Sequence, residues 1–138
     1  MNQWLRKLAP VFVVAMAISS APAFSQGGAG GQKPPFAGGD PNAKDPEVDK
    51  LVSAAEKLEK QSKAKPKDAK LKLKVADAYY NAGHAMMNSG KLASKVKYRG
   101  ALKHFRTALK YNPKHEQAAG EKKMIEDIYK SMGRPIPT

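Results

Sequence analysis

The chain has 138 residues, with 25 Lys and Arg against 12 Asp and Glu, which gives a formal net charge of +13 at pH 7. It contains no cysteine, which excludes a disulfide framework and a lipidated cysteine behind a signal sequence. The positive balance favours an acidic partner or an anionic surface.

The first 25 residues have the three parts of a secretory signal. Arg6 and Lys7 precede an apolar run over residues 8–18, and small residues, Ala23 and Ser25 among them, occupy the expected cleavage region. We therefore expect residues 1–25 to be a signal peptide and the protein to be exported, to a bacterial periplasm or to the exterior. The alternative is an uncleaved membrane anchor, although the apolar run is about half the ~20 residues that a spanning helix needs.

Composition then divides the rest of the chain. Residues 26–45 are rich in Gly, Pro, Ala and Asn, and they offer too little apolar surface to offset the entropy lost on ordering. We expect this segment to be a flexible tether. Residues 46–134 are expected to form one small helical domain, and residues 135–138 a short tail.

Two helices are predicted in the first half of the domain. The first covers residues 46–63, because Asp45 can cap it and Pro46 suits its first turn. The second covers residues 68–88. Gly83 is either a close-packing point inside this helix or its end, and we favour the longer helix because apolar residues continue the pattern beyond it. The inward residues of these two helices are expected to be Val48, Leu51, Val52, Ala55, Leu58, Leu71, Val75, Ala78, Tyr79, Ala82 and Met86.

Two more helices follow a loop at residues 91–97. The third is predicted over residues 96–112 and the fourth over residues 114–132, where Gly133 can cap it and two prolines prevent continuation. Their inward residues are expected to be Tyr98, Ala101, Leu102, Phe105, Ala108, Leu109, Ala118, Ile125, Ile128, Tyr129 and Met132. No segment alternates with the period of a strand, so the predicted fold class is all-α with four helices.

Helical patterns recur along the chain. The stretch Ala101, Phe105, Leu109 and Pro113 has a weaker counterpart 47 residues earlier, at Ala54, Leu58, Ser62 and Pro66. With Tyr98 before it and Val75, Tyr79 and Gly83 in the preceding helix, this pattern resembles the tetratricopeptide repeat, a 34-residue helix–turn–helix unit. The resemblance implies a short stack of helical hairpins over residues 46–133. An unrelated four-helix bundle is the alternative.

The resemblance also implies a binding surface. In the tetratricopeptide family, ligands lie on the concave face made by the first helices of successive repeats. At the matching positions here stand Lys70, Leu73, Lys74, Asp77, Tyr80, Asn81 and His84. The family's carboxylate-holding pattern has asparagine where this chain has Asp77.

Basic residues dominate the centre of the domain. Between Lys60 and Lys114 there are fifteen Lys or Arg and two acids. We expect a basic patch from Lys63, Lys65, Lys67, Lys95, Lys97, Arg99, Arg106 and Lys110. Nucleic acid is disfavoured as its ligand, because the region is mostly Lys and its aromatic rings fall on the expected core positions.

Catalytic and metal-binding patterns are weak. The acids form no pair in an apolar setting, and no phosphate-binding loop follows a strand, so we expect neither an enzyme nor a cofactor. His84 with Met86 and Met87 suggests a copper carrier, but neighbouring helical positions point about 100° apart. We expect no metal site, and we expect His104 and His115 to be exposed.

These features predict an exported helical-repeat adaptor or scaffold that binds an acidic protein or peptide. The alternative is a lysine-driven binder of anionic envelope surfaces or polyanions. Because a stack of so few repeats leaves open ends, self-association is a further expectation.

Overall fold

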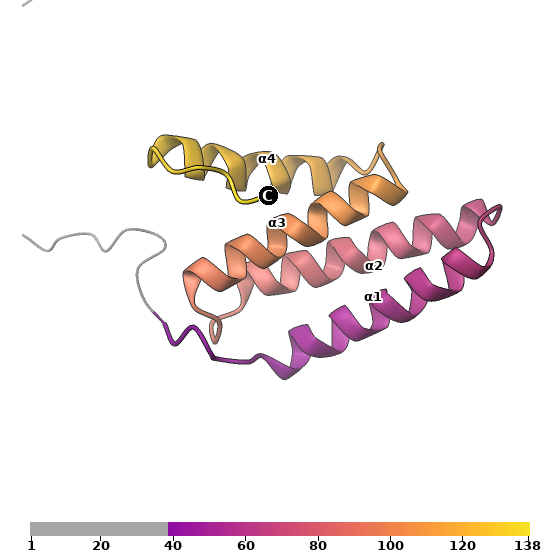
Figure 1. Ribbon diagram of the computed structural model, residues 1–138, viewed down its shortest axis with the longest axis horizontal. Coiled ribbons are helices and arrows are strands. Elements are labelled where there is room, and N and C mark those ends of the chain that lie inside the picture. The colour runs from indigo at the N-terminus through magenta and orange to yellow at the C-terminus, as the bar shows by residue number, and fades with distance from the viewer. Residues whose placement is uncertain (1–38) are drawn as a thin grey trace, which may run out of the picture. The chain divides into compact units, whose positions relative to one another are not determined.

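A computed structural model describes residues 39–138, which form four helices and contain no strand (Figure 1). They are α1 (Pro46–Ala64), α2 (Ala69–Asn88), α3 (Ser94–Tyr111) and α4 (Glu116–Ser131). The predicted all-α class and the four helices are confirmed. Helix α3 begins two residues earlier than expected and α4 begins two residues later. Each helix packs on the next one in the chain, so the four helices form a stack of helical hairpins.

The helix ends follow the capping signals in the sequence. The Asp45 side chain accepts a hydrogen bond from the Glu47 amide at 3.1 Å, and the Asp68 side chain accepts one from the Leu71 amide at 2.9 Å. At the far end Gly133 has a φ of +63°, and the next amide, of Arg134, donates to the Tyr129 carbonyl at 3.0 Å. This is the Schellman arrangement, which explains why a glycine follows the last turn of α4.

The core lies where the four predicted stripes meet. Its largest fully buried side chains are Val75, Leu102, Phe105 and Ile125. Small residues with no exposed surface surround them, which lets the helices approach closely; these are Ala55, Ala76, Ala82, Ala101, Ala108 and Ala118. Leu51 is the exception among the inward predictions, since it remains 38% exposed.

Gly83 is a point of close approach between α2 and α3. A Cβ atom added at Gly83 would lie 2.8 Å from Cε1 of Phe105 and 3.1 Å from Cβ of His104. The glycine is therefore interior to α2 because the Phe105 ring occupies the space of a side chain. The prediction of a longer helix with a close-packing point is confirmed.

Residues 39–45, which we expected to belong to the flexible tether, lie against the loop between α2 and α3. Ser89 donates to Asp45 Oδ2 at 2.7 Å, and its Oγ atom also accepts from the Lys91 and Leu92 amides. Gly39 has a φ of +92°, and a Cβ atom there would lie 2.7 Å from the Cα of Ala93. The long loop thus provides the contact surface for this segment. The rest of the predicted tether, and the predicted signal peptide, lie outside the described residues.

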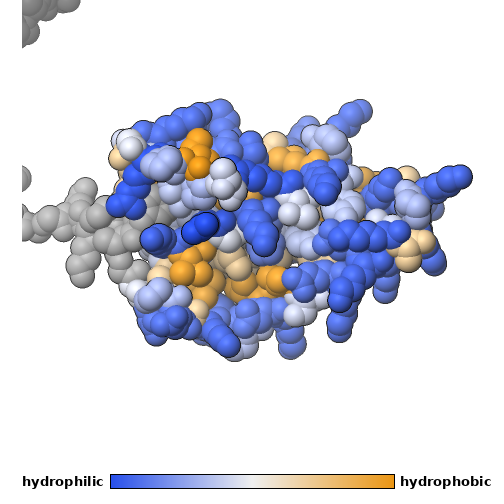
Figure 2. Space-filling model, viewed as in Figure 1, coloured by the Kyte–Doolittle hydropathy of each residue, from blue (hydrophilic) through white to orange (hydrophobic). Residues whose placement is uncertain are grey.

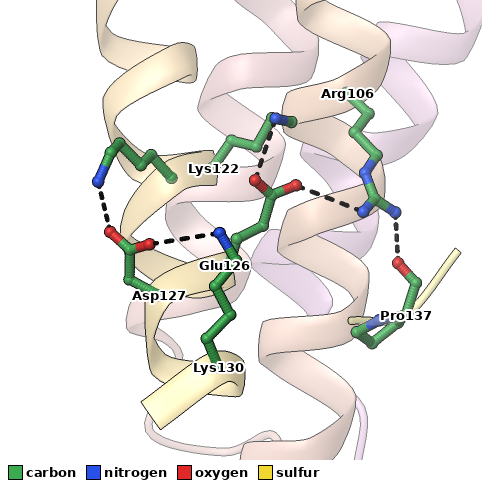
Figure 3. Close-up of polar contacts among 7 residues, drawn as sticks. Arg106, Lys122, Glu126, Asp127, Lys130 and Pro137 are labelled. Carbon is green, nitrogen blue, oxygen red and sulfur yellow. Dashed lines mark hydrogen bonds and ion pairs between the residues drawn. The ribbon is translucent and has the colours of Figure 1, made fainter. Parts of the chain in front are cut away.

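The C-terminal segment is attached to α3 through Arg106 (Figure 3). Its guanidinium donates to the Pro137 carbonyl oxygen at 2.5 Å and lies 3.5 Å from Glu126 Oε1 of α4. Lys122 also lies 3.2 Å from Glu126, so two cations contact this carboxylate.

A second ion pair lies on the exposed side of α4. A hydrogen bond of 2.6 Å from Lys123 holds the pKa of Asp127 below its ordinary value.

Candidate functional site: the face shared by α2 and α4

Tyr80 occupies the centre of the face shared by α2 and α4. Its hydroxyl donates to Glu121 Oε1 of α4 at 3.0 Å, and burial raises the pKa of this tyrosine. Its ring centroid lies 5.9 Å from that of Phe105 and 4.8 Å from that of His115. A predicted binding residue of α2 is therefore fixed by side chains from both later helices.

His84 approaches the same carboxylate one turn along α2. Its Nδ1 atom lies 2.8 Å from Glu121 Oε1, while its Nε2 atom lies 3.1 Å from Nδ2 of Asn88. An amide nitrogen can only donate, so Nε2 is the accepting atom and Nδ1 carries the proton given to Glu121. The other carboxylate oxygen, Oε2, is buried and has no partner among the described residues. The α2–α4 face therefore contains one carboxylate oxygen, Glu121 Oε2, that accepts no hydrogen bond from residues 39–138.

His115, the N-cap residue of α4, also contacts α2. Its side chain is 8% exposed, its Nδ1 atom accepts from the Ala118 amide at 3.2 Å, and its Nε2 atom lies 3.4 Å from Asp77 Oδ1. The expectation that His115 is exposed is wrong, because the imidazole caps α4 and packs on Tyr80. Asp77, the position at which the chain departs from the tetratricopeptide pattern, has this histidine as its neighbour.

The remaining predicted residues of α2 are open to solvent. Lys70, Lys74 and Asn81 are exposed, and Leu73 is 48% exposed between the two lysines. The seven predicted residues thus divide into two groups. Asp77, Tyr80 and His84 have partners on α4 or at its cap, whereas the side chains of the other four have no partner among residues 39–138. A binding partner would meet the second group without breaking the contacts of the first.

The residues of the predicted basic patch lie on several elements of the fold. Lys65 and Lys67 lie in the turn between α1 and α2, and Arg106 is held by Glu126 and Pro137. Lys97 donates to the Ser89 carbonyl at 3.3 Å. Lys95 and Arg99 border hollows beside the C-terminal segment, while Lys63 and Lys110 line a groove between α1 and α3.

Sequence reasoning missed a carboxylate that joins three helices. Glu59 of α1 accepts from the Tyr79 hydroxyl of α2 at 2.5 Å and from the Tyr111 hydroxyl of α3 at 2.9 Å, and Lys63 lies 3.0 Å away. The hydrogen bond from Tyr79 is the main cause that lowers the pKa of Glu59 to about 2. The partners stand 20 and 52 positions away in sequence, so no local pattern pointed to them.

Replacing Glu59 with glutamine should lower the free energy of unfolding at pH 7 by about 1–2 kcal/mol, since a neutral amide accepts more weakly from two hydroxyls. The folded-state pKa of about 2 lies below the ordinary 4.5, so the carboxylate stabilises the fold above pH 4.5. This contribution is lost as the pH falls from 4.5 towards 2. Urea unfolding across that range measures it. A difference that stays constant with pH would contradict the assignment. Glu56→Gln, which removes an exposed carboxylate of α1 that forms no hydrogen bond or ion pair among residues 39–138, is the matched control for the loss of one negative charge at pH 7.

His104 is also placed differently from expectation. It is 9% exposed, and its ring stacks on Tyr79 with the centroids 5.7 Å apart. Burial lowers the pKa of this imidazole, and the charge of Lys103 adds to the effect. The prediction of an exposed His104 is therefore wrong.

The alternative of a copper site does not match the geometry. His84 is directed to Glu121 of α4, whereas the Met86 sulfur lies against Gly100 of α3, 2.1 Å from the place a Cβ atom would take. The two potential ligands therefore face different helices. Among residues 39–138 no three His, Cys, Asp or Glu side chains are grouped to hold a metal ion.

Comparison of the chain with protein-family models, with curated proteins and with solved structures finds no match. Within the part of the chain that the structure describes, no helix combines the length and apolar character needed to cross a bilayer.

Proposed function

We propose that this protein is an exported helical-repeat adaptor that binds an acidic protein or peptide. The observation that carries the proposal is the face shared by α2 and α4. There, Tyr80 and His84 are fixed by Glu121, while Leu73 stands 48% exposed between Lys70 and Lys74. An exposed leucine bordered by lysines suits a partner segment with an apolar side chain followed by carboxylates.

The packing order supports the proposed repeat character. Helices α2 and α3 form one hairpin, α1 packs on α2 from the preceding side, and α4 packs on α3 from the following side. In a tetratricopeptide-like stack, α1 takes the place of a second helix and α4 that of a first helix. The face shared by α2 and α4 then corresponds to the concave surface of the family.

The surface composition supports an acidic partner. Figure 2 shows hydrophilic side chains over most of the face in view, with apolar patches between them. Lys60, Lys70, Lys74, Lys103 and Lys110 have no carboxylate partner among residues 39–138. The same lysines favour the second candidate function, a binder of anionic envelope surfaces or polyanions, which would depend on total charge rather than on one face.

Export remains part of the proposal on the grounds of the sequence. Residues 1–25 carry the basic, apolar and small-residue parts of a secretory signal, and they lie outside the described residues. The partner is accordingly proposed to belong to the cell envelope or to the exterior.

Leu73→Asp should reduce capture of the partner from an envelope extract by about tenfold. The change removes an apolar contact and places a negative charge opposite an acidic ligand, together worth roughly 1–2 kcal/mol. The matched control is Leu51→Asp, the same substitution at a 38% exposed leucine of α1. Capture that decreases equally with both variants, or with neither, would contradict a binding site on the α2–α4 face.

A further inference from the structure

A groove lies between α1 and α3 on the side of α2 that carries Tyr79, whereas Tyr80 points to the α2–α4 face. The groove encloses about 440 Å³. Lys60 and Lys63 of α1 and Lys103 and Lys110 of α3 line its walls, and Tyr79 contributes from α2. All four lysines are exposed, so their ammonium groups are available to a ligand.

The charge of the groove is positive after its internal pairs are counted. Glu59 is already held by Lys63 and by the hydroxyls of Tyr79 and Tyr111. Lys60, Lys103 and Lys110 have no carboxylate partner among the described residues. Glu56 is the other acid of the lining and forms no ion pair there. Three cations therefore stand against one free carboxylate.

His104 adds a polar group to the lining of the groove. Its side chain is about nine-tenths buried, and its Nδ1 atom has no hydrogen-bond partner within the described part of the chain. A buried N–H without an acceptor is costly, so the favoured neutral tautomer carries its proton on Nε2. No acceptor for that N–H lies among residues 39–138, so it can donate to a ligand oxygen.

The spacing of these groups favours an extended acidic segment over a compact anion. Lys103 and Lys110 are seven positions apart on one helix, which separates them by about 10 Å along its axis. The lining contains no arginine fork, and the Thr107 hydroxyl is engaged with the Lys103 carbonyl. Single carboxylates along a peptide can each meet one lysine, whereas one phosphate cannot reach them all.

We propose that the groove between α1 and α3 binds the acidic segment of a protein partner, with carboxylates at Lys60, Lys103 and Lys110 and one of them reaching His104. This inference rests on the proposed adaptor function and deepens it by placing the acidic part of the partner. The α2–α4 face then meets a different part of the same partner, on the other side of α2.

The test measures binding of a fluorescein-labelled peptide with four glutamates separated by glycine and serine. The groove variant is the full chain carrying both Lys103→Glu and Lys110→Glu. Both side chains are exposed, and an unchanged thermal melt confirms folding. The matched control carries Lys65→Glu with Lys67→Glu in the α1–α2 turn, which changes the net charge equally. We expect affinity to fall at least tenfold in the groove variant and at most about threefold in the control.

Two other probes separate the remaining explanations. The same peptide with glutamine in place of glutamate should bind at least tenfold more weakly, and phosphatidylglycerol vesicles should bind both double variants alike. Peptide binding that weakens equally in both double variants would overturn the groove as an acidic-peptide site. A groove variant that binds vesicles more weakly but keeps its affinity for the peptide would overturn it as well. Capture of the natural partner that depends on Leu73 but not on Lys103 and Lys110 would overturn this inference and leave the adaptor function standing.

Discussion

Replacing Phe105 with alanine should lower the free energy of unfolding by about 3–5 kcal/mol, which is the usual cost of removing a buried phenyl ring. Phe105 has no exposed surface, and it fills the space above Gly83 while its ring lies 5.9 Å from that of Tyr80. The cavity would open between α2 and α3, where the backbones already approach each other closely. Equilibrium unfolding in urea, followed by circular dichroism, gives the value.

A loss of this size is a large part of the stability of a domain of about 100 residues, so the variant should also bind its partner poorly. Leu73→Ala, at a 48% exposed side chain, is the control and should stay within about 0.5 kcal/mol of the unchanged protein. A loss below about 1 kcal/mol for Phe105→Ala would mean that the ring does not join the helices.

Gly83→Ala and Gly120→Ala should change stability in opposite directions. Alanine normally stabilises a helix interior by up to about 1 kcal/mol over glycine. At Gly120 of α4 an added Cβ atom meets nothing within 4 Å, so this gain should appear. At Gly83 the Cβ atom would lie 2.8 Å from the Phe105 ring, and overpacking of this kind typically costs about 1–3 kcal/mol.

Thermal and urea unfolding of the two variants decide the point. The Gly83 variant should be destabilised and the Gly120 variant stabilised. If both substitutions stabilise the protein, α2 and α3 are not in close contact at Gly83. If both destabilise it, the effect cannot be assigned to the Phe105 ring.

The helices were predictable because apolar periodicity and capping residues agree along most of the chain. Asp45 and Gly133 were predicted as helix caps, and each acts as one; Asp68, which was expected to begin the second helix, caps it. The start of α3 had no capping signal in the sequence, because Ala93, its N-cap residue, has no side chain that can accept a hydrogen bond. The result is an error of two residues at that boundary.

The burial of His104 could have been found from the sequence. It follows Ala101 by three positions and precedes Phe105 and Ala108, so it lies on the same helical stripe as three fully buried residues. Treating histidine as a surface residue concealed this. The position of His115 had a weaker signal, because an imidazole is an uncommon helix cap.

The candidate sites were less accessible to sequence reasoning. Counting lysines reveals an excess of charge but not which helix faces share a groove, and Arg106 and Lys63 are engaged by Glu126 and Glu59. The contacts of Glu121 with Tyr80 and His84 join positions 41 and 37 residues apart. Such long-range pairs depend on how the helices pack, which one sequence does not encode in any local pattern.

The most direct test of the adaptor account places a photo-activated cross-linking amino acid at position 73, and separately at position 51, in the protein made by its own cells. Both positions are exposed leucines, on α2 and α1 respectively. Mass spectrometry of the adducts should identify one acidic envelope or extracellular protein, cross-linked efficiently from position 73 and weakly from position 51. Equal yields from both positions, or adducts spread over many unrelated proteins, would contradict the account.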